Sequence, residues 1–144
     1  MLDIGCGPGG QVALAGSLGI TPRGIDNEPN VDPHVLHDFT DGPIRIRPLY
    51  DLGWCVDFLD HVEERYLPNV ASAFQRCKVV VITHTLPGRS DRIPVNCQKP
   101  YYWREWFKRQ GFKYLPESTH ALKAASTMNR EFIQQTGAVF EKEY

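Results

Sequence analysis

The sequence predicts a single α/β domain, residues 1–144, built around a doubly wound and mainly parallel sheet. Three observations lead to this prediction. Short apolar runs alternate along the chain with amphipathic stretches of helical period. The run VVVI at 79–82 is continuously β-branched, which is typical of a strand covered on both faces. A chain of 144 residues is long enough for one hydrophobic core.

The N-terminal half predicts four strands and two helices. A buried strand over 2–4 ends at glycines, and Gly19 ends a short helix over 11–18. A longer helix is expected over 60–77, with Pro68 as the place for a bend. The remaining strands of this half are expected over 23–26, 35–36 and 50–56.

The C-terminal half predicts three further strands. A loop over 83–98 follows the β-branched strand, and Pro100 then opens a helix that Gly111 caps. A helical stretch is expected over 118–135. The closing strands, which would form the far edge of the sheet, are expected over 112–115 and 138–140.

The composition excludes several classes of protein. Apolar residues make up 42% of the chain and charged residues 23%, as in ordinary globular proteins. We expect no contact with a membrane, because no apolar run is long enough to cross one. The four cysteines form no CxxC pair, and nothing at the N-terminus resembles a signal peptide. A reduced, cytoplasmic setting therefore fits best.

The net charge of −1 is unevenly distributed along the chain. Residues 1–72 carry a balance of −7 and residues 73–144 a balance of +6. The two sets either form opposite faces of the domain or interleave in space.

The motif DIGCGPG at 3–9 follows a strand and opens a helix. Gly5, Gly7 and Gly9 allow a tight turn and a close approach of the backbone to a ligand. The helix that follows offers unpaired N–H groups at its start. An ordinary glycine-rich turn is the alternative, but strand, loop, helix and acidic residue together favour a cofactor loop.

Two cofactors must be compared at this loop. Gly5, Gly7 and Gly10 also satisfy the dinucleotide pattern GxGxxG, which is weak when it stands alone. Asp3 favours S-adenosylmethionine (SAM), because its carboxylate can meet the ammonium of a methionine moiety, which nicotinamide cofactors lack. The chain is also short for a nucleotide domain with a separate substrate domain.

Two further acidic residues follow the second and third strands. Asp26 can accept hydrogen bonds from both hydroxyls of a ribose, and Asn27 follows it. Asp38 can accept from an adenine amino group, with Phe39 beside the ring. Each acid could also have a purely structural role. Asp26 could be an exposed residue at the end of a strand, and Asp38 could cap a turn or a helix.

Taken in order, DIGCGPG, GIDNEP, HDF and YDLGWCVDFLDHVEE resemble the class I (Rossmann-like) SAM-dependent methyltransferases, from residue 1 to about 82. The later segments VNCQ, YW and GF resemble those of small phage or environmental methyltransferases. If the protein is viral, the resemblance implies that it works in the host cytoplasm. The resemblance implies a seven-stranded sheet with helices on both faces and an antiparallel last strand. It implies cofactor contacts at Asp3, Gly5, Cys6, Gly7, Gly9, Asp26, Asn27, Asp38 and Phe39, with Cys55 and Val56 at the methionine end.

Members of this class usually carry helices before the glycine-rich strand, and these helices cover the cofactor. The sequence begins inside that strand, so we expect the N-terminal helices to be absent. The site would then be open or covered by a second copy or a partner chain, unless the segment is missing. We also expect apolar sheet surface to lack its usual covering helix.

The resemblance implies methyl transfer to an unidentified acceptor, with oxygen or nitrogen as the methylated atom. The alternatives are a SAM-binding protein without its own turnover and an enzyme that degrades SAM. His61 and His84 are candidate general bases. Arg89, Arg92 and Lys99 fall in the loop expected to border the site, which favours an anionic small molecule or nucleic acid as acceptor.

Asp57, Asp60 and His61 have the spacing i, i+3, i+4, which would place them on one face of a helix. They resemble the Glu-x-x-Glu-His element of ubiquinone-pathway and small-RNA methyltransferases, where His84 would match a further ligand. This resemblance implies a possible Mg²⁺ or Mn²⁺ site. Capping of the helix start by the two acids is the favoured alternative.

Overall fold

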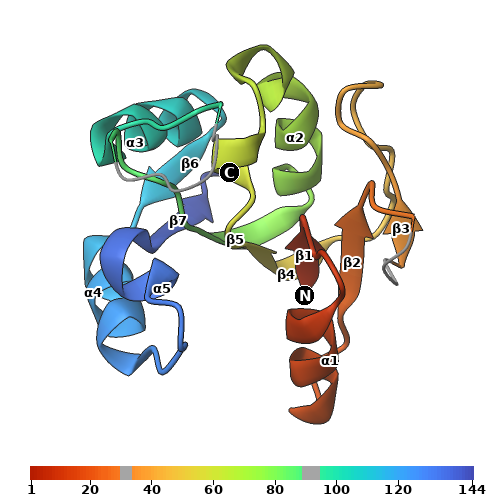
Figure 1. Cartoon of the computed structure of the whole chain (residues 1–144), viewed down its shortest axis with the longest axis horizontal. Coiled ribbons are helices and arrows are strands. Elements are labelled where there is room, and N and C mark those ends of the chain that lie inside the picture. The colour runs from red at the N-terminus through yellow and green to blue at the C-terminus, as the bar shows by residue number, and fades with distance from the viewer. Residues whose placement is uncertain (30–33, 89–94) are drawn as a thin grey trace.

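The computed structural model describes residues 1–29, 34–88 and 95–144, and a seven-stranded sheet forms its centre (Figure 1). The strands follow the order β3-β2-β1-β4-β5-β7-β6. Their bounds are β1 (Leu2–Ile4), β2 (Arg23–Asp26), β3 (Val35–Leu36), β4 (Tyr50–Cys55), β5 (Cys77–Ile82), β6 (Phe112–Tyr114) and β7 (Ala138–Lys142).

The strand directions confirm the predicted doubly wound sheet. Strands β1 to β5 pair in parallel, whereas β7 runs antiparallel between β5 and β6. The carboxyl ends of β1, β2, β4 and β5 therefore meet at one edge of the sheet, where ligands bind in folds of this architecture. The loops that carry the predicted motifs all leave the sheet at this edge.

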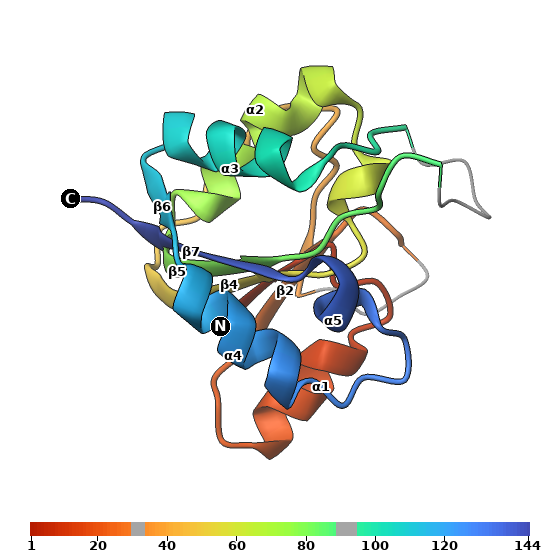
Figure 2. The same ribbon diagram turned by 90° about the vertical axis from the view of Figure 1, so that its left-hand side faces the viewer.

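Helices cover both faces of the sheet (Figure 2). Helices α2 and α3 lie on one face, and α1, α4 and α5 lie on the other. Their bounds, with those of two 3-10 turns, are α1 (Gly10–Ser17), η1 (Leu59–His61), η2 (Glu64–Tyr66), α2 (Leu67–Phe74), α3 (Pro100–Arg109), α4 (Pro116–Ala125) and α5 (Phe132–Thr136). None of the described helices has the length and apolar character needed to span a membrane.

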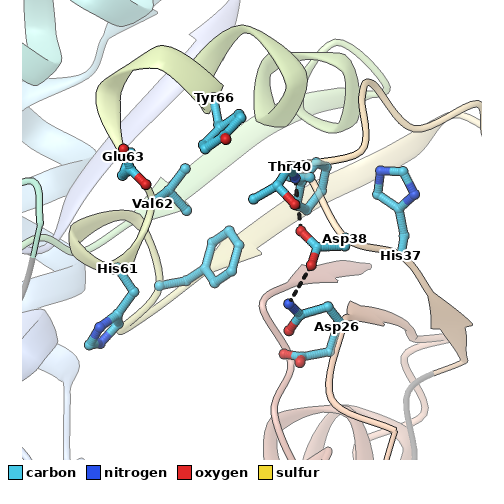
Figure 3. Close-up of a pocket in the computed structure, with 11 residues that line it drawn as sticks. Asp26, His37, Asp38, Thr40, His61, Val62, Glu63 and Tyr66 are labelled. Atoms are coloured by element: carbon cyan, nitrogen blue, oxygen red, sulfur yellow. Dashed lines mark hydrogen bonds between the residues drawn. The ribbon is translucent and has the colours of Figure 1, made fainter.

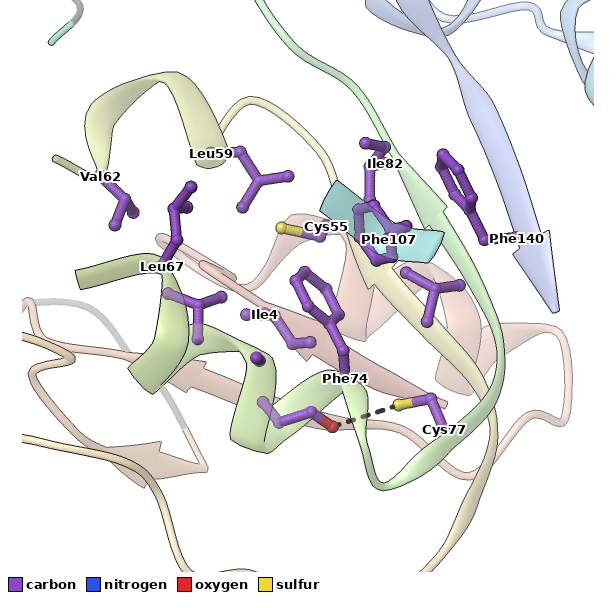
Figure 4. Close-up of a cluster of buried hydrophobic side chains, with 14 of the residues drawn as sticks. Ile4, Cys55, Leu59, Val62, Leu67, Phe74, Cys77, Ile82, Phe107 and Phe140 are labelled. Carbon is purple, nitrogen blue, oxygen red and sulfur yellow. Dashed lines mark hydrogen bonds between the residues drawn. The ribbon is translucent and has the colours of Figure 1, made fainter. Parts of the chain in front are cut away.

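The main core lies between the sheet and α2 and α3 (Figure 4). Phe107 of α3 stacks on Phe140 of β7 with ring centroids 4.3 Å apart. Phe74 of α2 meets Phe107 at 5.1 Å, so both helices share one aromatic contact with the sheet. Burial of such rings supplies much of the free energy that fixes the helices on this face.

A second, smaller cluster lies on the opposite face of the sheet. There, Val81 of β5 and Val139 of β7 are buried together with Ile133 of α5. The Thr119 hydroxyl of α4 accepts a hydrogen bond from the Val139 amide at 2.9 Å. Helices α4 and α5, which follow β6 in the chain, therefore cover β5 and β7 here.

Two predicted helices differ from the structure. The stretch 60–77 starts with η1 and η2, and the α-helix begins only at Leu67. Pro68 lies in the first turn of α2, where its missing N–H is not needed, so it starts this helix instead of bending it. The stretch 118–135 contains two helices, because Ser126 is extended and ends α4. Ser126, Thr127 and Asn129, which have weak helix propensity, lie between the two helices.

Candidate functional site

The glycine loop after β1 is built on backbone conformations that favour glycine. Gly5, Gly7 and Gly9 have φ angles of 78°, 49° and 81°. The amides of Gly5 and Cys6 both donate to the carbonyl oxygen of Ile25, at 2.9 and 3.1 Å. The loop is therefore tied to the neighbouring strand β2 before α1 begins.

Gly5 also lies directly under an aromatic ring. A Cβ atom at Gly5 would be 2.2 Å from Cδ2 of Phe58, far inside van der Waals contact. Phe58 in turn faces Phe39, with ring centroids 6.0 Å apart. Absence of a side chain at Gly5 thus allows the segment after β4 to approach the glycine loop.

Asp26, at the carboxyl end of β2, holds the glycine loop with its side chain. Its Oδ2 accepts a hydrogen bond from the Gly7 amide at 2.8 Å, and its Oδ1 accepts from the Glu28 amide at 3.0 Å. Each carboxylate oxygen has a second lone pair. Asp26 can therefore hold the loop and still accept hydrogen bonds from a ligand.

Asp38 follows β3 and is held from two sides (Figure 3). Asn27 donates to Oδ2 at 3.0 Å, and the Thr40 amide donates to Oδ1 at 2.8 Å. These hydrogen bonds lower the pKa of Asp38, and the bond from Asn27 has the largest effect. The ionised carboxylate is thus fixed in place, beside the buried ring of Phe39.

One cavity of about 250 Å³ joins these residues at the carboxyl edge of the sheet (Figure 3). The sequence-predicted residues Asp26, Asn27, Asp38 and Phe39 line it together with His61. Its other lining residues are His37, Thr40, Phe58, Val62, Glu63 and Tyr66. In Figure 3 the Asp26 and Asp38 side chains lie at one end of the cavity and His61 at the other.

Asp3 is a buried acid next to the glycine loop. It is 3% exposed, and its Oδ2 has no hydrogen-bond partner among the described residues. Burial, with a smaller contribution from the charge of Asp26, raises the pKa of Asp3 to about 7. An unpartnered buried carboxylate favours a cation as its ligand.

The cysteines and Val56 lie away from the cavity. The Cys6 side chain packs against Gly24 of β2, where an added Cβ would be 2.6 Å from its sulfur. Cys55 is completely buried in the core, and burial raises the pKa of its thiol. Val56 packs against the smaller apolar cluster. Their predicted cofactor contacts remain predictions.

Asp57, Asp60 and His61 come together, although not on one face of an α-helix. Asp57 precedes η1 and has a φ of 56°. One ligand atom from each of the three residues lies within 4.8 Å of the others. His61 Nε2 is 3.9 Å from Asp57 Oδ1 and 3.8 Å from Asp60 Oδ2. The predicted cluster therefore forms, but by a tight turn after β4.

Three interactions constrain these acids. The Thr85 hydroxyl donates to Asp60 Oδ2 at 2.7 Å, and the Asp57 amide donates to the Thr83 hydroxyl at 2.9 Å. Arg130 Nη1 lies 4.0 Å from Asp57 Oδ2. The turn after β4 is thus fastened to the segment after β5, and one acid already faces a positive charge.

His84 does not join this cluster. It is buried after β5, where its ring faces Trp103 with centroids 6.1 Å apart. Burial lowers the pKa of His84, so the ring favours its neutral form. The two candidate bases therefore line different cavities, His61 the one with Asp38 and His84 another near α3. Of the predicted basic residues, Lys99 is exposed, and Arg89 and Arg92 lie outside the described residues.

Comparison with solved structures identifies the fold. The magnesium protoporphyrin IX methyltransferase ChlM from Synechocystis PCC 6803, with bound S-adenosylhomocysteine (SAH), superposes with a TM-score of 0.65 at 13% identity, over 99% of this chain and 73% of that one. A SAM-dependent methyltransferase from Archaeoglobus fulgidus gives 0.64 at 18% identity, over 99% and 85%. The methyltransferase domain of bacterial CtHen1 gives 0.63 at 14%, over 99% and 89%.

The chain has the class I methyltransferase fold. The seven-stranded order with an antiparallel β7, together with these three superpositions, establishes it. No protein-family model matches the sequence, and no curated protein matches it either. The relationship is therefore visible in the three-dimensional structure and in short motifs.

Sequence analysis missed several residues of this methyltransferase-fold cavity. Val62, Glu63 and Tyr66 come from the segment predicted as the start of a long helix, and Phe58 comes from the link before it. In the structure this stretch forms η1 and η2 instead of a continuous helix. A signal for Phe58 was present, since a large apolar residue just after a strand often packs on a neighbouring glycine.

We predict that Gly5→Ala destabilises the domain by about 1–3 kcal/mol, because the new methyl group meets Phe58 at a positive φ. Gly10→Ala is the matched control, since a Cβ there meets no atom within 4 Å and α1 begins at this residue. Denaturant unfolding measures both free energies. Equal effects of the two substitutions would contradict the described packing.

We predict that Asp3→Asn changes how stability depends on pH. Folding raises the pKa of Asp3 from 3.8 to about 7, so the wild type loses stability as pH rises through this window. The variant has no ionisable group at this position, so it does not lose this stability. Between pH 4 and pH 8 its free energy of unfolding should therefore rise by up to about 4 kcal/mol relative to that of the wild type. Urea unfolding at several pH values measures it; a pH-independent difference would show that Asp3 ionises normally.

Proposed function

We propose that the chain is a SAM-dependent methyltransferase acting on an oxygen or nitrogen acceptor. One observation carries the proposal: Asp26, Asn27, Asp38 and Phe39, from two separate motifs, line a single cavity beside the glycine loop. Three structural neighbours described as methyltransferases support the same class of reaction.

The residues present fit SAM in three ways. Asp26 and Asp38 offer fixed carboxylate lone pairs for the ribose hydroxyls and the adenine amino group. The rings of Phe39 and Phe58 give the cavity an apolar wall for the base. Asp3 offers the ammonium group a buried oxygen that has no hydrogen-bond partner among the described residues. Cofactor-bound ChlM structures, one with SAH and one with SAM, support this assignment.

When bound, SAM supplies an activated methyl group whose transfer leaves a neutral thioether, so no acid is needed to assist departure. The residues of the chain then orient the acceptor and exclude water. His61, half-exposed beside two carboxylates, is placed to accept a proton from an acceptor hydroxyl or amine. His84 is enclosed against Trp103, which makes His61 the better candidate base.

Two other activities remain distinguishable by their products. A SAM-binding protein without turnover would return intact cofactor, and a SAM-degrading enzyme would release cofactor fragments without a methylated product. Neither alternative is supported by the neighbours described above.

We further propose that a second copy or a partner chain covers the open side of the cavity. The oligomeric state in solution tests this proposal.

A divalent cation is a second candidate cofactor, favoured by the close approach of Asp57, Asp60 and His61. Carboxylate oxygens and an imidazole are suitable ligands for Mn²⁺. Arg130 opposes it, because its guanidinium already lies 4.0 Å from Asp57. The cluster also has a role without metal, since Asp57 and Asp60 lie within 4 Å of His61 Nε2 and border the face from which an acceptor would approach.

We predict that Asp26→Ala weakens SAM binding by about 1.5–3 kcal/mol, the scale of hydrogen bonds to a charged group. The variant also removes the acceptors for the Gly7 and Glu28 amides, so the loop loses an anchor. Asp41→Ala is the control, because Asp41 is an exposed acid outside the cavity lining. Calorimetry measures both; no heat with SAM or SAH, beside tight binding of NAD, would overturn the proposed function.

We predict that Mn²⁺, if it binds, broadens the NMR signals of His61 before those of His84. Arg130→Gln should tighten Mn²⁺ binding several-fold, because it removes the competing positive charge from Asp57. Methyl transfer is then measured with and without a chelator. Absence of broadening, with activity unaffected by chelation, would exclude the metal and leave His61 as the general base.

A further inference from the structure

A second, smaller cavity of about 80 Å³ lies next to the start of α3, the end of β6 and helices α4 and α5. Its size suits one small chemical group, since whole small-molecule sites usually exceed about 300 Å³. His84 and Trp103 line it, with Lys123 and Arg104 contributing the charge. It shares no lining residue with the larger cavity that holds Asp26 and Asp38.

The charge of this small cavity is one-sided. Arg104 and Lys123 line it, and none of its lining residues is acidic. Pro100, the first residue of α3, also lines it, and the first turn of that helix carries no acid. The positive end of the α3 dipole therefore adds to two cationic side chains. This environment favours an anion.

Both cations are held by their neighbours. The Arg104 guanidinium stacks over the Tyr114 ring at 4.2 Å, and its Nη2 donates to the Tyr114 hydroxyl at 3.4 Å. Lys123 Nζ donates to the carbonyl oxygen of Gln135 at 3.2 Å. An ammonium has three donors and a guanidinium five, so each keeps free N–H groups for a ligand.

Two residues that line the cavity carry a fully buried ring nitrogen without a partner among the described residues. These nitrogens are Nδ1 of His84 and Nε1 of Trp103, in side chains that are 6% and 1% exposed. Backbone groups of Thr85 and Gln98 favour the protonated imidazole, but they do not satisfy Nδ1. An indole N–H can only donate, so its missing partner is an acceptor. A buried donor without a partner is costly, so the Trp103 indole N–H is sensitive to any acceptor that approaches this wall.

The small cavity lies beside the candidate acid–base cluster. Residues 83–85 link the two, because Thr85 donates to Asp60 and Thr83 accepts from the Asp57 amide. The backbone amide of His84, between them, donates to the Thr136 hydroxyl at 3.1 Å. A molecule anchored by an anionic group in the small cavity could thus extend toward His61.

We propose that this cavity binds a compact oxyanion, a phosphate or a carboxylate, and that the anion belongs to the methyl acceptor. The assignment to the acceptor rests on the proposed function, whereas binding of the oxyanion itself does not. The free N–H groups of Lys123 and Arg104, which both line the cavity, supply the donors. The enzyme would then select acceptors that carry a negative group at a fixed distance from the methylated atom.

The test uses the full chain labelled with ¹⁵N and titrated with inorganic phosphate in one arm and acetate in the other. The indole N–H signal of Trp103 should shift in at least one arm, and the arm with tighter binding identifies the anion. The signal of Trp106, which does not line the cavity, should stay in place. No shift at Trp103 in either arm would overturn the proposal and leave a cavity that holds only water.

Lys123→Gln should weaken binding of the preferred anion about tenfold or more, since it removes a charged hydrogen-bond donor. Lys108→Gln is the matched control, because it removes an equal charge from α3 outside the cavity lining. Equal weakening by both variants would indicate general charge attraction and overturn the site. SAM binding, followed by calorimetry, should be unchanged in both, so failure of the anion site is distinguishable from failure of the proposed function.

Discussion

The hydrogen bond from the Gly7 amide to the Asp26 carboxylate, at 2.8 Å, is the contact on which the site depends. It joins the loop after β1 to the end of β2, and the Ile25 carbonyl reinforces the joint with two further amides. This anchoring requires positive φ angles at three glycines. Phe58 packs on Gly5 of the same loop, and Asn27, next to Asp26, holds Asp38.

A buried charge lies close to this anchor and sets its electrostatics. Asp3 lies within the sheet, and its pKa of about 7 results from burial and from the nearby charge of Asp26. Two acids in such proximity make this end of the sheet favourable for a cation. The same property that weakens the unliganded fold at neutral pH therefore favours a ligand with an ammonium group.

The carboxyl edge of the sheet is divided between two environments. The larger cavity is lined by the acids Asp26 and Asp38, whereas the smaller one near α3 contains Lys123 and Arg104. The segment 83–85 separates them and holds the turn that carries His61. The acidic lining of the larger cavity would suit a cationic group and the basic lining of the smaller one an anionic group, and His61 lies in the larger cavity.

The sequence by itself determined the sheet, the glycine loop and the acids at the ends of β2 and β3, because these depend on local periodicity and on glycine. It could not determine the turn at Asp57, which has a positive φ and replaces the expected helix start. It predicted His61 and His84 as related candidates, and only the tertiary structure separated them into different cavities. The physical reason is that burial and pairing of these side chains depend on contacts between strands and helices far apart in the chain.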